Sequence, residues 1–339
     1  PVISSPRTAA AEYALVIAAP AGTKPDISVL SVRFWRSAYW SDSSNSYSFD
    51  IHEAYGAYAY LVVISPDLIK CLTIMKSKTY FEIDALSAKR IAVAAQGLNR
   101  PRVEGKVTQR HFRRVFEDIG LVQLDSVQAV CRSHYLVFFS RLGNYERSKL
   151  DDWVWHSGEI FESWAHEASI LPVETEPFVR WKKTRARKGE TWKGLFELAN
   201  SQSEYVRDVM NQVLLASSPV KASELNEPRN RSGSWWSGRS DGQKTLDWLF
   251  RIGELAVKRD KNFSRSYVPF RLAIPSEISN FPDPIERDAI NELILLSARC
   301  NGISTVSDIA DYFRIKTSLV RDALPSLLEQ KKLLSATVE

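Results

Sequence analysis

Cysteine is scarce in this sequence of 339 residues, and its scarcity narrows the class of protein. The three cysteines, Cys71, Cys131 and Cys300, lie far apart, are odd in number and show no CxxC spacing. A disulfide framework or a cysteine-rich zinc site is therefore not expected. A reducing, cytoplasmic location is the simplest inference.

Long apolar runs are missing as well. The apolar stretch YGAYAYLVVI, at 56–65, has only ten residues and is followed by Pro66, Asp67 and Lys70. A membrane-spanning helix needs roughly 18 or more apolar residues. The N-terminus also lacks the charged start and apolar core of a secretory signal. We therefore expect no association with a membrane.

Motifs that bind nucleotide phosphates or metals are also absent. Neither GxxxxGK[ST] nor GxGxxG occurs in the sequence. The stretch AHEAS, at 165–169, has the His–Glu pair of a zinc protease, but the residue four after His166 is Ile170 rather than histidine. His166 and Glu167 are therefore interpreted as possible supports of a neighbouring site. No metal or cofactor is predicted.

The charge is mildly basic and unevenly distributed. The formal net charge is +5, yet residues 1–74 hold five Lys and Arg against six Asp and Glu. The basic excess therefore lies entirely in the later part. It fits an anionic partner such as nucleic acid, although a soluble basic protein without such a partner is an equally open reading.

Residues 1–74 differ in character from the rest of the chain. They are rich in Ser, Ala and Tyr, include SDSSNSYS at 41–48, and show little amphipathic periodicity. Regular helix and turn signals begin after Met75. The segment is interpreted as a mis-started extension translated from upstream sequence, or as a disordered extension, and we favour the first.

From residue 75 onward the sequence predicts a mainly α protein with small β-hairpin wings, an α+β fold. A helix over 108–119 is indicated by a cap at Thr108, apolar residues at helical spacing and a stop at Gly120. Hairpin signals follow a helix at ELAVKRD and FSRSYVP. Three helices with a hairpin describe a winged helix. The predicted regions are a first winged helix at 75–202, a second at 203–272 and a third at 283–339.

One apolar segment carries two polar side chains two residues apart. Gln123 and Asp125 are embedded in GLVQLDSVQAV, between Val122, Leu124 and Val127. In an extended strand Gln123 and Asp125 would share one face, and Val122 and Leu124 would share the other. The pattern is typical of either a half-buried strand or a site backed by a hydrophobic core.

Two basic or aromatic stretches admit two interpretations each. WKKTRARK, at 181–188, either contacts phosphates or forms a solvated helix face. GSWWSGRSDGQK, at 233–244, contains Trp235 and Trp236 in a Gly- and Ser-rich stretch. The two tryptophans either stack on nucleic acid bases or pin the loop to the protein.

Several of these stretches together resemble the AlkZ/YcaQ family of bacterial DNA glycosylases. They are LVQLDSVQAVCRSHYLVFFSRLGNY, ESWAHEASILP, SGSWWSGRSDGQKTLDWLFRIGELAVKRDKNFSRSYVP and SARCNGISTVSDIADYFRI, in that order. The resemblance covers roughly residues 80–339. It implies three tandem winged helices, and it implies a catalytic signature of Gln, an apolar residue and Asp or Gln, matched here by Gln123, Leu124 and Asp125.

The resemblance also implies an activity and a partner. It implies removal of alkylated purines, including N7-alkylguanine, and unhooking of interstrand crosslinks in double-stranded DNA, by a protein that we expect to be a monomer. Gln123 and Asp125 are the predicted catalytic residues. The predicted DNA contacts, chosen by chemistry and neighbourhood, are Arg132, His134, Trp235, Trp236, Lys258 and Arg259.

Two departures from the family keep other functions open. Family members carry a β-barrel-like module after the third winged helix, and no segment of this sequence is expected to supply it. Residues 1–74 also have no counterpart. An inactive truncated member is therefore one alternative, and a winged-helix transcription regulator without catalysis is another. A regulator would prefer one DNA sequence, whereas a repair enzyme would bind largely through phosphates.

Overall fold

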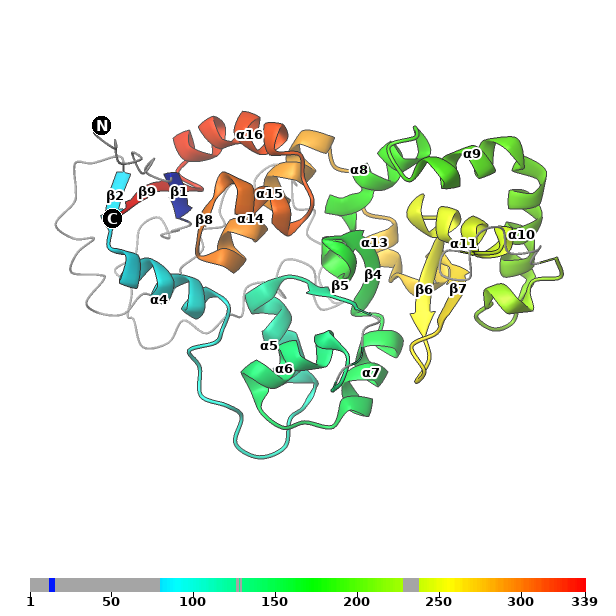
Figure 1. Cartoon of the computed structure of the whole chain (residues 1–339), viewed down its shortest axis with the longest axis horizontal. Coiled ribbons are helices and arrows are strands. Elements are labelled where there is room, and N and C mark those ends of the chain that lie inside the picture. Colours follow the sequence, from blue (N-terminus) through cyan, green and yellow to red (C-terminus); the bar gives the residue numbers. More distant parts are fainter. Residues whose placement is uncertain (1–11, 16–79, 126–127, 129, 228–237) are drawn as a thin grey trace, which may run out of the picture.

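A computed structural model describes residues 12–15, 80–125, 128, 130–227 and 238–339 (Figure 1). The described part is mainly helical and carries small sheets, as the sequence predicted. Trp235 and Trp236 lie outside it, as does most of the 1–74 segment. Among the described residues, no helix has both the length and the apolar run needed to cross a membrane. Cys131 and Cys300 are free and buried.

The first group of elements contains the Gln123–Asp125 segment. Its elements are α4 (Ala85–Ala95), α5 (Gln109–Ile119), β3 (Val122–Gln123), α6 (Ser133–Leu142), α7 (Arg147–His156), β4 (Ile160–Ala165) and β5 (Glu167–Pro172). The strands form an antiparallel sheet in the order β3–β5–β4. Helices α5, α6 and α7 lie together on one side of it (Figure 1).

Helix α5 begins and ends where the sequence predicted. The backbone N–H of Thr108 donates to Nδ1 of His111 at 3.0 Å and so closes the first turn. Phe112 and Phe116 face the core. Gly120 ends the helix at φ 62°, a left-handed conformation that costs glycine little. The chain can therefore turn directly from α5 into strand β3.

The second group of elements follows β5 without a break. Its elements are η1 (Val173–Thr175), α8 (Glu176–Arg187), α9 (Lys193–Ser201), α10 (Ser203–Leu215), η2 (Ala222–Glu224), α11 (Asp241–Arg251), β6 (Leu255–Arg259) and β7 (Arg265–Pro269). The predicted hairpin is confirmed, with Leu255 opposite Pro269 and Arg259 opposite Arg265. After Lys221 the chain forms only the short 3-10 turn η2.

The third group of elements completes the described chain. Its elements are α12 (Phe270–Ala273), α13 (Ser276–Ser279), α14 (Glu286–Asn301), β8 (Ile303–Thr305), α15 (Val306–Tyr312), α16 (Thr317–Glu329) and β9 (Leu334–Val338). Strands β8 and β9 join β1 (Glu12–Leu15) and β2 (Tyr80–Ile83) in a sheet of order β2–β9–β1–β8. Thr305 caps α15, since its Oγ1 accepts from the backbone N–H of Asp308.

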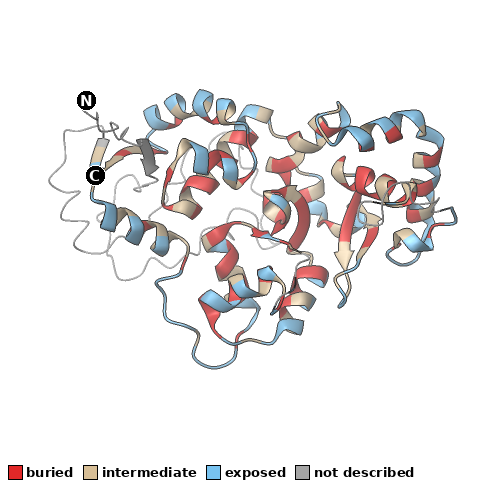
Figure 2. Cartoon of the chain, in the orientation of Figure 1, coloured by how far each residue is buried: buried red, intermediate tan, exposed pale blue. Residues whose placement is uncertain are grey.

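The hydrophobic core connects these groups. One cluster of buried side chains runs from β4, β5 and α8 into α14, α15 and α16, and includes Phe161, Leu171, Leu293 and Phe313. Figure 2 shows the buried residues concentrated where these elements meet. The β3–β5–β4 sheet is therefore packed against the third group through this cluster, and a second cluster packs it against helices α5, α6 and α7 of its own group. The division at residues 74, 202 and 272 stays a prediction.

Candidate active site

Strand β3 exposes one polar face and buries the other. Val122 and Leu124 are 2% and 7% exposed, whereas Gln123 is exposed and Asp125 is half-buried. Gln123 lies opposite Ser169 of β5, and the backbone N–H of Leu124 continues the pairing by donating to the Ala168 carbonyl at 2.7 Å. The segment is extended at Val122 and Gln123, which is the conformation that would place Gln123 and Asp125 on one face. Gln123 and Asp125 therefore leave the strand on the same side.

The turn between β4 and β5 carries His166 to Gln123. Ala165 and Glu167 are the last pair of the hairpin, and Glu167 adopts φ 59° there. Nδ1 of His166 is 3.2 Å from Oε1 of Gln123, and its Nε2 is 3.3 Å from Oδ2 of Asp311 on α15. His166 therefore bridges the side chain of Gln123 to the third group of elements.

The two neighbours of His166 limit its hydrogen-bonding pattern. Oε1 of Gln123 and Oδ2 of Asp311 are both acceptor oxygens, so a ring with an N–H on each nitrogen would donate to both. A neutral ring has a single N–H, so it would donate to Asp311 through Nε2 and accept at Nδ1 from the Gln123 amide N–H after that amide turns over. In either arrangement the imidazole fixes the plane of the Gln123 amide and leaves its remaining polar atoms for a ligand.

A hollow of about 860 Å³ opens beside Gln123 and His166. Asp311 and Tyr312 of α15, Arg141 of α6 and apolar side chains including Leu98 and Leu136 also line its wall. Arg141 is nearly buried, and its Nε donates to the Gln96 carbonyl at 2.7 Å. Asp125 follows Gln123 by two residues, after the end of β3, and is not one of the residues that line the hollow. The site therefore combines a polar edge with a largely apolar hollow.

The predicted contacts at Arg132, His134 and Arg259 meet around one aromatic ring. Phe263, at the tip of the β6–β7 hairpin, has the Arg259 guanidinium 4.0 Å from its centroid and that of Arg132 at 4.5 Å. The ring of His134 stacks on Phe263 at 5.4 Å with an interplanar angle of 11°. These three residues therefore attach the hairpin to the start of α6.

Lys258 and Arg259 also have partners inside the fold. Nζ of Lys258 donates to the Trp155 carbonyl at 2.6 Å. The guanidinium of Arg259 donates to both oxygens of Glu162 at 2.7 and 2.8 Å. The DNA contacts predicted at these positions stay predictions, and in the structure these two charges hold β6 against β4 and α7.

Burial of His134 makes a pH-dependent contribution to stability. Burial, with Arg132 and Arg259 nearby, lowers the pKa of His134 to about 4 from its ordinary value near 6.5. The unfolded chain therefore binds more protons than the folded one between these values, and stability is lost as the pH falls through that window. We expect the loss to reach about 3 kcal/mol.

The matched test replaces His134 by Phe, which keeps a ring against Phe263. The difference in unfolding free energy between the two chains should change by up to about 3 kcal/mol from pH 7 to pH 4. Urea unfolding at each pH would measure it. Parallel curves for the two chains would show that His134 does not titrate in this way.

The comparisons with known proteins bear on the same residues. A family model described as DNA glycosylase AlkZ-like matches residues 116–339, well over half of the chain. The chain belongs to the AlkZ-like DNA glycosylase family. The match takes in β3, His166 and Asp311, whereas α4 and most of α5 precede it.

One solved structure is similar to this AlkZ-like chain. It is the Streptomyces sahachiroi DNA glycosylase AlkZ, with 13% sequence identity and a TM-score of 0.47. The alignment covers 72% of this chain and 66% of that protein. The chain therefore spans slightly less than two thirds of the length of its structural relative.

The described residues show how this AlkZ-like site is composed. No three His, Cys, Asp or Glu side chains of the described part come together as a metal ion would require. Gln123, Asp125 and His166 were predicted from the sequence, the last as a supporting residue. Asp311 was not predicted, because only the fold brings α15 to the turn at His166.

Proposed function

We propose that this AlkZ-like chain hydrolyses the N-glycosidic bond of alkylated purines in double-stranded DNA. The proposed substrates are N7-alkylguanines, including those in interstrand crosslinks. The observation that carries the proposal is the strand at Gln123 and Asp125, whose polar face is exposed while its apolar face is anchored in the core. Membership of a DNA glycosylase family supports it.

Release of an N7-alkylated guanine needs little acid catalysis from the protein. Alkylation of N7 makes guanine cationic, so the base leaves as a neutral molecule with the electron pair of the glycosidic bond. The sugar develops oxocarbenium character, which a carboxylate stabilises. Asp125 provides that carboxylate and takes the proton of the attacking water, while the Gln123 amide holds the water. The products are the free base and an abasic sugar with a new hydroxyl group.

The arrangement of elements supports three winged helices in tandem. Helices α5, α6 and α7 are followed by the β4–β5 hairpin, and α11 is followed by the β6–β7 hairpin. Helices α14, α15 and α16 are followed by β9. We infer that these units place the protein on duplex DNA, since helix–turn–helix units with wings are a common DNA-binding architecture.

Base release tests the proposal. The chain would be mixed in excess with a duplex containing one N7-methylguanine, and free base would be quantified against the same duplex without protein. Release well above the spontaneous rate is the expected result. Folded protein that prefers one DNA sequence and releases no base would instead match a regulator, and folded protein with neither property would match an inactive member.

His166 provides a test of positioning. His166→Ala should lower the single-turnover rate by about 10- to 100-fold, because the Gln123 amide loses the contact that orients it. DNA affinity should change little, so the effect appears in the rate rather than in the half-saturating concentration. His156→Ala, at an exposed position on α7, is the control. Equal rates for both variants would show that His166 does not position the Gln123 amide.

A further inference from the structure

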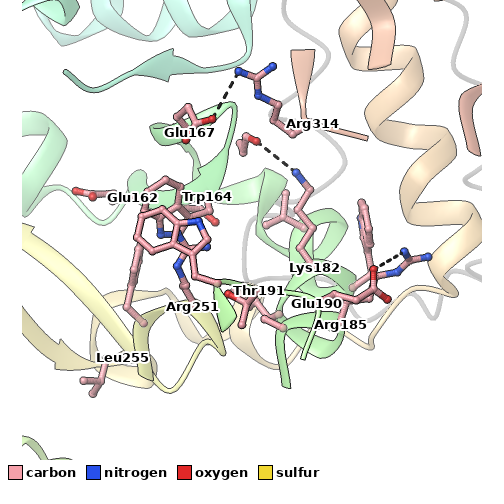
Figure 3. A pocket seen from close by; sticks show the side chains of 18 of the residues that line it. Glu162, Trp164, Glu167, Lys182, Arg185, Glu190, Thr191, Arg251, Leu255 and Arg314 are labelled. Atoms are coloured by element: carbon pink, nitrogen blue, oxygen red, sulfur yellow. Dashed lines mark hydrogen bonds and ion pairs between the residues drawn. The ribbon is translucent and has the colours of Figure 1, made fainter. Parts of the chain in front are cut away.

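A second hollow lies on the other side of the β4–β5 turn from Gln123. It measures about 300 Å³ and is bounded by β4, α8, α11 and the segment after α15 (Figure 3). Cationic and tryptophan side chains dominate its walls, among them Lys182, Arg251, Arg314, Trp164 and Trp192. The proposed hydrolysis uses none of these residues.

Arg251 is held between two tryptophans. Its guanidinium carbon lies 4.0 Å from the centroid of Trp164 and 4.4 Å from that of Trp192. Figure 3 shows it beside Trp164 at the wall of the hollow. Burial lowers the pKa of Arg251 to about 10, so it remains charged at neutral pH. The two rings meet at an interplanar angle of 60° and pack against the guanidinium from two directions.

Arg251 has no carboxylate in direct contact among the described residues, although Asp247 and Glu167 are near enough to favour its charged form. Across residues 80–125, 130–227 and 238–339, its guanidinium makes no hydrogen bond or ion pair. Asp247, one turn earlier in α11, pairs instead with Arg239 and Arg265. A fixed guanidinium with unused N–H donors at the wall of a hollow is suited to a tetrahedral oxyanion.

Most other cations at the hollow are already paired. Arg185 and Lys316 pair with Glu190, and Arg314 lies 3.6 Å from Glu167. Lys182 differs, because its Nζ donates to the carbonyls of Ala165 and Phe313 and has no carboxylate partner among the described residues. Arg251 and Lys182 are therefore the two cations of this lining that form no ion pair among the described residues.

We propose that this hollow binds a phosphoryl group, with Arg251 as the residue that contacts it. The inference rests on the proposed function for the source of the group, a phosphodiester of the DNA held for base removal. The hollow and the Gln123 site share the β4–β5 turn, since Ala165 and Glu167 line the former and His166 the latter. Trp192 is 50% exposed and is left accessible for contact with the adjoining nucleoside.

DNA affinity measured over a range of salt concentrations tests this proposal. Arg251→Gln is expected to weaken binding of an undamaged duplex about tenfold and to reduce the salt slope by about one. Arg207→Gln, at an exposed position on α10, also removes one positive charge and should leave both nearly unchanged. The same affinity and slope in the parent chain and Arg251→Gln would overturn DNA as the source of the phosphoryl group, and the same variant's loss of stabilisation by inorganic phosphate then decides whether the site itself stands.

Two further measurements separate the remaining explanations. Arg251→Lys keeps the charge and should recover most of the slope; if it is folded and recovers none, the arginine serves only to pack the tryptophans and the proposal fails.

Thermal shifts with inorganic phosphate identify the source of the phosphoryl group. Stabilisation of the parent chain by phosphate that Arg251→Gln abolishes, with DNA binding unaltered, would keep the phosphoryl site but overturn DNA as its source. If the parent chain releases no base but Arg251→Gln still reduces the salt slope, the proposed function is wrong and the phosphoryl site stands.

Discussion

Asp125→Asn is expected to reduce base release by about 100- to 1000-fold while the protein remains folded and continues to bind DNA. The substitution keeps the size of the side chain and removes the charge that stabilises the oxocarbenium-like sugar. The backbone pairing of this segment with β5 does not depend on the carboxylate, since Leu124 makes it through its main chain. Single-turnover release of N7-methylguanine measures the rate.

A matched control distinguishes catalysis from a general effect of charge. Asp152 lies exposed on α7, and Asp152→Asn removes one carboxylate from the same group of elements. Its rate should equal that of the parent chain. Release by Asp125→Asn at the parent rate, from protein with an unaltered circular dichroism spectrum, would exclude Asp125 as the catalytic carboxylate.

Glu162→Gln is expected to cost about 3–5 kcal/mol of unfolding free energy, because it breaks a buried ion-pair network. The Glu162 side chain is fully buried on β4 and accepts from Arg259 and Arg265 at distances of 2.7–2.9 Å. Arg259 is itself only 8% exposed. The neutral amide would leave the two guanidinium groups without their shared counter-charge and would turn an N–H₂ group toward one of them. Urea unfolding monitored by tryptophan fluorescence measures the loss.

The exposed ion pair between Arg187 and Glu254 supplies the comparison. It spans 3.1 Å, with both side chains nearly half exposed. Glu254→Gln should cost at most about 1 kcal/mol, because water already screens the pair. Equal losses in the two variants would mean that the Glu162 network does not hold the β6–β7 hairpin against the β3–β5–β4 sheet.

Short-range sequence patterns predicted the helix and the strand that carry the Gln123–Asp125 segment. Thr108 and Gly120 marked the ends of α5, and the alternation of Val122 and Leu124 with Gln123 and Asp125 marked the extended strand. These signals act over a few residues, so they survive in a single sequence. The hairpin of β6 and β7 was visible for the same reason.

The contacts around the motif depend on residues distant in sequence. His166 is separated from Gln123 by 43 positions and from Asp311 by 145. The turn that brings it there was not predicted, because Glu167 adopts the left-handed conformation at a position where a glycine would have marked the turn. Asp311 carried no signal beyond its place in a predicted helix.

Charged residues were the hardest to interpret from the sequence. Lys258 and Arg259 were chosen as DNA contacts for their charge, yet both groups bond to neighbours inside the fold. Arg251 drew no attention within its helical segment, yet it packs against two tryptophans and forms no ion pair among the described residues. A sequence records a charge but not its partner, and the partner decides whether the charge is available to a ligand.

The most direct test of the central claim is a double-mutant cycle on Gln123 and Asp125. Single-turnover release of N7-methylguanine would be measured for the parent chain, Gln123→Ala, Asp125→Asn and the double variant. If the two side chains act on one water, each single variant is slow and the double variant is no slower than the worse of the two. Equal release by all four chains, or losses that simply multiply in the double variant, would contradict a single site at this strand.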